Sequence, residues 1–249
     1  MTADARLIAD LKQLWLQAFD DTADVPEAFF ATGFSPGRFQ CVWRDDKPVS
    51  ALYWFNCTLY GQKIAYIYAA ATDEAYRGRG LFRQLMTQTH ETLAQKGYTG
   101  AVLVPGSREL IGLYEKLGYI PVTSVTEFAC DWGSMPVPLQ EVSLDRYAAL
   151  RKKLLPEGGL LQEGETLAFL HTQGKFYAGA DFLLAAAVED GALVVQELLG
   201  DTNAAPGILR ALNLPRGRFR APGTDRAFAM FLPLQPDCPV PTYLGLALD

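Results

Sequence analysis

The residues best suited to chemistry in this sequence form one short loop, Tyr76-Arg77-Gly78-Arg79-Gly80-Leu81. An apolar strand pattern ends just before the loop, and an amphipathic helix pattern begins at Gly80. The first amide groups of a helix have no partner within the helix, and the helix dipole adds positive potential there. Glycines let the backbone wrap closely around a ligand, and arginines pair well with phosphates. The loop therefore predicts an anion site suited to a pyrophosphate.

Other phosphate loops and metal sites fit the sequence less well. The P-loop pattern G-x-x-x-x-G-K-[ST] is absent, and a dinucleotide fingerprint needs a third glycine where Arg83 stands. A surface turn explains the same glycines, so their spacing alone leaves that alternative open. The four cysteines and two histidines have no zinc-like spacing, so we expect no metal site. We expect His90, in mid-helix, to be exposed.

The loop resembles the acyl-CoA-binding motif of the GNAT superfamily of N-acetyltransferases, [QR]-x-x-G-x-[GA], which lies between a bulged strand and a helix. Residues 77–81 fit the motif, and Phe82 departs from it where small residues are usual. In the family, the backbone of the splayed strand hydrogen-bonds pantetheine as another strand would. The resemblance thus implies that acetyl-CoA is bound by Ala70, Ala71, Thr72, Arg77, Gly78, Arg79, Gly80, Leu81, Phe82 and Arg83.

A second segment, residues 113–119, resembles the family's (F/L)-Y-x-x-x-G-(F/Y) pattern. The resemblance implies that Tyr114 is the catalytic acid that protonates the departing thiolate. Its alternative role is that of an amphipathic core residue beside Ile111 and Leu117. The base that deprotonates the amine stays open, because the strand at 63–72 has no carboxylate. Candidates are Asp73 and Glu74 (more naturally loop decoration), a residue of the second part, and the carboxy terminus. Tyr66 and Tyr68 could line the acceptor site or equally be core aromatics.

The predicted elements agree with this resemblance over residues 7–130. Helical patterns cover 5–19 and 25–34, and strand patterns at 38–44, 49–59 and 63–72 predict an antiparallel meander. After the helix that begins at Gly80, a buried strand at 100–105 should run parallel to 63–72. A helix to Leu117 and further strands over 119–132 follow. The implied fold is the α/β (α+β) GNAT fold, a mixed and mostly antiparallel sheet flanked by helices.

The remaining sequence predicts a second, smaller α+β domain. A Pro-rich stretch at 133–138 marks the boundary, giving domains 1–134 and 135–249. Helical patterns at 143–155, 163–172 and 203–212 accompany a hairpin around Asp190-Gly191 and strands near 217–221, 226–232 and 243–248. Residues 203–207 stand where a cofactor loop would lie, without its arginine. This part weakly resembles the degenerate half of tandem acetyltransferases; a different small domain is the alternative.

Composition narrows the function further. The net charge of −6 disfavours nucleic acid, and no apolar run is long enough to span a membrane. We expect a cytoplasmic monomer or homodimer. The resemblance implies transfer of an acetyl group from acetyl-CoA to a primary amine of a small molecule or peptide by direct attack. The alternative is a non-catalytic acyl-CoA-binding regulatory module. The sequence does not identify the acceptor or the acyl length.

Overall fold

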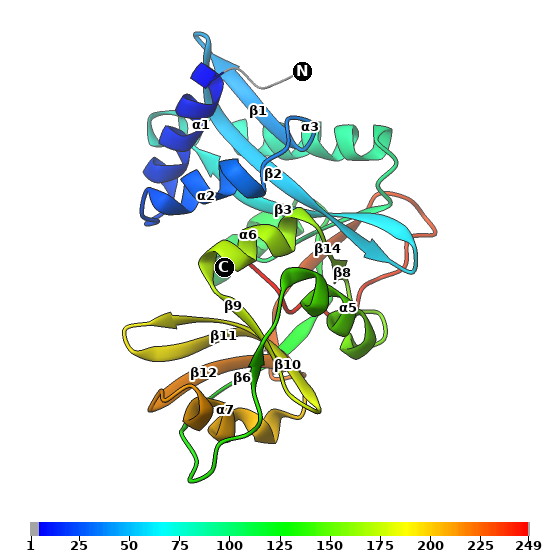
Figure 1. Cartoon of the computed structure of the whole chain (residues 1–249). Helices are drawn as coiled ribbons and strands as arrows, with labels where there is room; N and C mark the ends of the chain where they lie inside the picture. Colours follow the sequence, from blue (N-terminus) through cyan, green and yellow to red (C-terminus); the bar gives the residue numbers. More distant parts are fainter. Residues whose placement is uncertain (1–4, 249) are drawn as a thin grey trace.

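The computed structural model describes residues 5–248, which form two sheets lying one above the other (Figure 1). The first sheet has the order β1-β2-β3-β4-β14-β5, with β8 beside β2. The predicted meander is confirmed, since β1, β2 and β3 pair antiparallel, and β4 runs parallel to β3. The strands of this sheet are β1 Phe39–Arg44, β2 Lys47–Leu59, β3 Gln62–Thr72, β4 Gly100–Leu103, β5 Ile120–Pro121, β8 Leu161–Gln162 and β14 Met230–Pro233.

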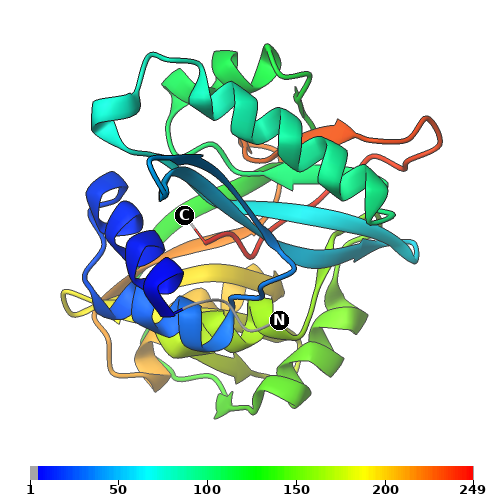
Figure 2. The same ribbon diagram turned by 90° about the horizontal axis from the view of Figure 1, so that it is seen from above.

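Helices cover both faces of the first sheet (Figure 2). On one face, α1 (Ala5–Ala18) and α2 (Asp24–Thr32) bury Trp15 and Phe29. On the other, α3 (Leu81–Gln95) and the short α4 (Ile111–Glu115) bury Leu85, Met86 and Tyr114. The apolar residues recur at helical spacing, so each helix has one face to place against the sheet. Two short 3₁₀ turns precede α3 and α4, and they are η1 Glu74–Tyr76 and η2 Arg108–Leu110.

The second sheet has the order β13-β6-β12-β11-β10-β9-β7. Its hairpin turns at Asp190-Gly191, as predicted, and both residues have positive φ, as tight hairpin turns require. Two helices, α5 (Leu144–Leu154) and α6 (Glu165–Gln173), pack on one face, and α7 (Ala205–Ala211), preceded by η3 (Thr202–Ala204), packs on the other. The strands of this sheet are β6 Ser124–Asp131, β7 Gln140–Glu141, β9 Lys175–Ala178, β10 Phe182–Glu189, β11 Ala192–Gly200, β12 Arg216–Pro222 and β13 Arg226–Ala227.

A two-stranded ribbon carries the chain from one sheet to the other and back. The chain leaves the first sheet from β5 into β6 and returns from β13 into β14. These strands pair antiparallel in one continuous register, from Ile120↔Phe231 to Val125↔Arg226. Between the sheets, the amide of Val122 donates to the carbonyl of Ala229 at 3.1 Å. The strand predicted over 226–232 is therefore divided between the sheets at this crossing.

The ribbon affects where the chain can be divided into domains. All strands of the second sheet lie within 124–227, so the expected division at 134 falls inside the segment that builds that sheet. Strand β14, from the predicted second part, lies between β4 and β5 of the first sheet. A Pro-rich stretch predicts a break in regular structure, but it carries no information on which sheet its flanking strands join.

The strand predicted over 243–248 is wrong. Within the described chain, this segment makes one isolated parallel bridge, between Tyr243 and Gly159. It lies between the two sheets, with Leu244 in a core of the first and Leu246 in a core of the second. Side chains rather than a neighbouring strand satisfy part of its backbone, because Gln162 donates to the carbonyl of Leu246. Apolar alternation alone did not distinguish such a buried extended segment from a strand.

Candidate active site

The end of β3 contains a bulge and then separates from β4. Tyr53 pairs with Tyr68 and Ala51 with Ala71, so one extra residue is accommodated, and Ala69 has a φ of 47°. The parallel pairing with β4 ends at Tyr66, and the rest of β3 is paired in the sheet only with β2 among the described residues. The predicted residues Ala70, Ala71 and Thr72 thus lie on a bulged strand with an open flank, as strand-like binding of an extended ligand requires.

The loop after β3 is built by its own backbone. Asp73 accepts a hydrogen bond from the amide of Ala75 at 2.9 Å, which starts η1. Gly78 and Gly80 have φ angles of 72° and 76°, and Gly80 is the N-cap of α3. A β-carbon at either glycine would meet no atom within 4 Å, so conformation rather than crowding favours glycine there. The sequence predicted this loop from these two glycines.

The amides at the start of α3 are free to bind a ligand. The first bond that closes the helix runs from the amide of Gln84 to the carbonyl of Gly80 at 3.0 Å. In the described chain, the backbone amides of residues 78–83 donate no hydrogen bond. Several free amides at one helix start, together with the helix dipole, make a site for an anion. The side chain of Leu81 is buried beside Leu85 and fixes this end of the helix to the core.

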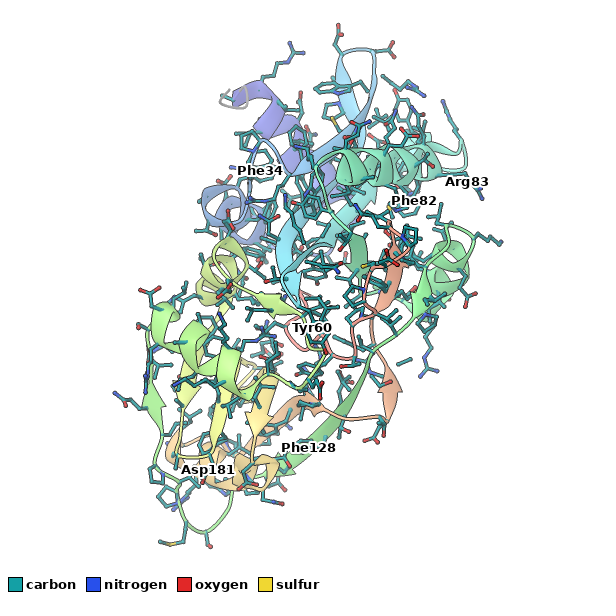
Figure 3. The ribbon with its side chains drawn as sticks, turned by 90° about the vertical axis from the view of Figure 1, so that its right-hand side faces the viewer. Phe34, Tyr60, Phe82, Arg83, Phe128 and Asp181 are labelled. Carbon is teal, nitrogen blue, oxygen red and sulfur yellow. The ribbon has the colours of Figure 1, made fainter. Side chains whose placement is uncertain are left out.

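The three predicted arginines surround this site and are exposed. The Nε of Arg77 donates to the carbonyl of Thr72 at 3.2 Å. Arg79 donates to the carbonyl of Ala75 at 3.1 Å and lies over the ring of Tyr76. Arg83 extends outward from the first turn of α3 (Figure 3). Because a guanidinium has five N–H donors, Arg77 and Arg79 keep donors for a phosphate while they brace the loop.

Tyr114 lies against the first turn of α3, although the two are far apart in sequence. Its ring packs edge-to-face with Phe82 at 5.9 Å between ring centroids, and with Tyr119 at the same distance. Phe82, which departs from the usual small residue, thus forms a direct contact between the loop and Tyr114. The hydroxyl of Tyr114 has no hydrogen-bond partner in the part of the chain described. Burial raises the pKa of Tyr114 to about 12, so it is a protonated donor at neutral pH.

His90 supports this tyrosine pair from the last part of α3. Its Nε2 lies 2.9 Å from the hydroxyl of Tyr119, which is fully buried. The expectation that His90 is exposed is wrong: it is half-buried, and burial lowers its pKa to about 4. A neutral imidazole can accept the hydrogen bond of the Tyr119 hydroxyl. The sequence offered no indication of this contact beyond the position of His90 on the helix.

On the opposite face, Tyr66 and Tyr68 contribute to an aromatic core rather than to the loop. Tyr68 lies 5.7 Å from Phe29 and 6.1 Å from Phe169 of α6, measured between ring centroids. Burial, followed by the nearby Tyr66 and Asp21, raises the pKa of Tyr68 well above its ordinary value. Of the two roles left open for these tyrosines, the structure shows both packed in the aromatic core.

The candidates for the base that the sequence names lie in two places. The side chain of Asp73 is engaged in capping η1, and Glu74 is exposed on the same loop. The carboxy terminus lies outside the described residues, so this candidate stays a prediction. Across residues 5–248, no three His, Cys, Asp or Glu side chains gather as a metal site. Nor does any helix in that range have the length and apolar character needed to cross a membrane.

Two surface hollows differ in their relation to the loop. One, of about 400 Å³, borders the loop at Asp73 and Tyr76 and continues to Arg44 and Lys47. A larger hollow, of about 510 Å³, lies at the ends of β6, β11 and β12 in the second sheet. Size alone would favour the larger hollow as the ligand site. The free amides and the bulged strand, however, belong to the first sheet, on which the smaller hollow lies.

Residues 2–122 match the family described as an acetyltransferase (GNAT) domain. This part of the chain is a GNAT acetyltransferase domain. GNAT proteins bind acyl-CoA, and the family match supports acyl-CoA-dependent acyl transfer as the general activity. The free amides at the start of α3 and the splayed β3 fit that cosubstrate. Comparison with curated proteins gives no match.

Solved structures of other GNAT proteins have a similar fold. A GCN5-related N-acetyltransferase from Anabaena variabilis has a TM-score of 0.75 at 17% identity, covering 94% of this chain and 72% of that one. One from Kribbella flavida has a TM-score of 0.69 at 19% identity, covering 94% and 71%. A tandem GNAT protein from the clavulanic acid biosynthesis pathway has a TM-score of 0.56 at 11% identity, covering 95% and 97%. These similarities extend through both sheets and confirm the fold expected from the sequence.

Proposed function

We propose that this protein is an N-acetyltransferase that transfers the acetyl group of acetyl-CoA to a primary amine of a small molecule or peptide. In this proposal, the amides of residues 78–83 bind the pyrophosphate, and the backbone of residues 70–72 binds the pantetheine arm. The arginines around the loop pair with the phosphates of the cosubstrate. The full set proposed to bind acetyl-CoA is Ala70, Ala71, Thr72, Arg77, Gly78, Arg79, Gly80, Leu81, Phe82 and Arg83.

The proposed reaction is direct attack. The amine nitrogen attacks the carbonyl carbon of the thioester, a C–N bond forms, and the C–S bond breaks. The leaving thiolate takes a proton from the hydroxyl of Tyr114, while the attacking nitrogen loses its proton to a base or to water. Holding amine and thioester together in the correct orientation supplies several kcal/mol of the barrier, roughly 7 to 11 in favourable cases.

One observation carries the proposal: Tyr114 packs on Phe82 in the first turn of the helix whose free amides would grip the diphosphate. A diphosphate bound at that helix start fixes one end of the cosubstrate, and the open flank of β3 gives the extended arm a path. Tyr114 lies within the same region, buried and protonated. An anion site with no proton donor nearby would support a role in binding CoA and not in catalysis.

Calorimetry followed by a turnover assay tests the proposal. CoA should bind with measurable heat, and acetyl-CoA should release free thiol when an amine is added. A suitable panel is benzylamine, putrescine, lysine and a tripeptide amide, with acetylation confirmed by mass spectrometry. Absence of CoA binding would overturn the proposal.

A non-catalytic acyl-CoA-binding regulatory module is the second candidate. It is favoured by the absence of any carboxylate from β3, which leaves no acid residue on that strand to deprotonate an amine. Tight CoA binding without thiol release for any amine of the panel would support this candidate. Such a module would have no use for a proton donor at position 114, so Tyr114→Phe, which keeps the ring, would leave its CoA affinity unchanged.

A further inference from the structure

A fully buried ion pair joins the second sheet to a helix that packs on it, and neither residue takes part in the reaction proposed above. Arg151 of α5 and Glu197 of β11 meet through two hydrogen bonds, of 2.7 Å from Nε and 3.0 Å from Nη2. Both side chains have no exposed surface. Burying two charges costs several kcal/mol per ion, which is offset only by excellent geometry and further hydrogen bonds. The structure supplies those further bonds from three separate segments.

Two tyrosine hydroxyls donate the remaining hydrogen bonds to the carboxylate of Glu197. Tyr147, one turn before Arg151 on α5, donates to one oxygen of Glu197 at 3.2 Å. Tyr243, in the C-terminal segment 243–248, donates to the other at 3.1 Å. The two hydroxyls make equivalent bonds to the same group. One belongs to a helix of the second half, and the other belongs to a segment that lies between the two sheets.

The same pair also reaches β8, the short strand that joins the first sheet. The guanidinium of Arg151 lies 3.4 Å from the carbonyl of Leu160 and 3.4 Å from the side-chain oxygen of Gln162. The amide nitrogen of Gln162 donates to the carbonyl of Leu246 at 2.7 Å. Gln162 is itself paired with Cys57 of β2. One buried network therefore connects the C-terminal segment to both sheets.

The C-terminal segment is fitted closely to this network. A β-carbon on Gly245 would lie 2.0 Å from the hydroxyl of Tyr243 and 2.4 Å from an oxygen of Glu197. No other residue fits there without moving the ion pair. Beyond this point, the amide of Leu248 donates to the hydroxyl of Tyr66 at 3.0 Å. Tyr66 is the last residue of β3 that pairs with β4, so the segment meets β3 where the two strands separate.

We propose that Arg151 and Glu197 are positioning residues for the acyl-transfer site. They hold segment 243–248 against β3 at Tyr66, where β3 and β4 separate, and there the segment forms a wall on the side from which the amine approaches. The inference rests on the proposed function, because it assigns the wall to that same site. It gives the second half a role that needs no cofactor of its own. The pair orients the segment through Tyr243, and the segment limits where an amine approaches the thioester.

The two tyrosines provide a matched pair of variants. Tyr243→Phe and Tyr147→Phe each remove one hydrogen bond to Glu197 and keep the ring. Both should lower the stability of the protein by a similar amount, which thermal unfolding measures. We expect Tyr243→Phe to raise the KM of the amine most active in the panel at least fivefold. Tyr147→Phe should leave that KM within twofold, and CoA affinity by calorimetry should be unchanged in both.

Hydrogen–deuterium exchange gives an independent measurement. Amides of residues 243–248 should exchange faster in Tyr243→Phe than in Tyr147→Phe, because only the first variant releases the segment. Equal KM values for the two variants, or equal exchange in the segment, would overturn the inference while leaving the proposed function intact. Absence of CoA binding by the unsubstituted protein would overturn the proposed function and the inference with it.

Discussion

The two sheets share one order of elements but differ in the loop that could bind a cosubstrate. In each, an antiparallel hairpin leads into a helix and then into a parallel strand, namely β2–β3, α3 and β4 in the first and β10–β11, α7 and β12 in the second. The ribbon then supplies the next antiparallel strand to each sheet, β14 beside β4 and β6 beside β12. This agreement makes the second sheet a counterpart of the first in topology.

The connections before the two helices are unlike. Before α3, residues 73–80 include Gly78 and Gly80 at positive φ and leave several amides free. Before α7, the short η3 follows at once, and Asp201 caps it by accepting from the amide of Asn203 at 3.0 Å. Pro206 in the first turn of α7 has no amide hydrogen to offer. The comparison teaches that this topology does not create an anion site unless the loop also frees its backbone donors.

The largest expected effect comes from separating the two regions. A fragment ending at residue 134 lacks β14, so β4 would lose its antiparallel partner and keep only β3, and Phe231 would leave the first core. We expect this fragment to lack cooperative thermal unfolding by circular dichroism and to bind no CoA in calorimetry. A fragment that unfolds cooperatively and binds CoA like the full chain would show that the first region does not depend on β14.

Gly80→Asp should remove CoA binding while the fold persists. The substitution places a side chain at a φ of 76° and a negative charge at the helix start, where we propose the diphosphate binds. We expect the affinity measured by calorimetry to fall at least about 100-fold, or roughly 2.7 kcal/mol. The matched control is Thr202→Asp, which adds the same charge before α7. An equal loss of CoA affinity in the control would contradict the comparison.

Tyr114→Phe should reduce turnover without reducing binding. Loss of a general acid typically lowers a rate by about 10²- to 10⁴-fold, and we expect about 100-fold in kcat. The ring contact with Phe82 remains, so CoA affinity should stay within twofold. Tyr177→Phe, in β9 of the second sheet, is the control and should have normal kcat. An unchanged kcat in Tyr114→Phe would return Tyr114 to the role of a core residue.

The smallest expected effect concerns the pH dependence of stability. The pKa of His90 is lowered to about 4 in the folded protein, against about 6.5 in the unfolded chain. Between these values the unfolded chain binds more protons, so His90 should reduce stability as pH falls from about 6.5 to 4, on the order of 2 kcal/mol. His90→Gln should flatten the free energy of unfolding against pH in this range. An unaltered slope in His90→Gln would contradict the assignment.

Most of the first sheet could be predicted because its signals are local. The meander has short turns, α3 and α1 have regular apolar spacing, and Asp190-Gly191 determines a hairpin in the second sheet. The loop at residues 76–81 was also predictable, since two glycines and two arginines directly before a helix favour a tight turn with free backbone amides and positive charge. The residues proposed to bind acetyl-CoA do lie together, although their roles stay proposals.

The long-range arrangement could not be predicted from the same patterns. Nothing in the short apolar segment Met230–Pro233 specifies that it pairs with β4 rather than with its sequence neighbours. The contact between His90 and Tyr119 joins residues on different elements, and no periodicity indicates it. The C-terminal segment reads as a strand by alternation, yet it is held by side chains of Gln162 and Tyr66. Such contacts depend on how whole elements meet in space.

The ribbon between the sheets has a consequence for engineering the chain. Val122 and Ala229 are hydrogen-bonded neighbours, so the chain leaves the first sheet after 122 and re-enters it at 229 in an adjacent position; among the described residues in between, only the short β8 pairs with the first sheet, beside β2. A two-residue Asn-Gly link in place of that stretch would turn β5 and β14 into an ordinary hairpin in their existing register. The resulting miniature would retain β1 to β5 and β14 and would lose β8. The second sheet is joined to the first by this ribbon, by β8 and by the C-terminal segment, so a different domain grafted at the ribbon would need to supply new partners for β2 and for that segment.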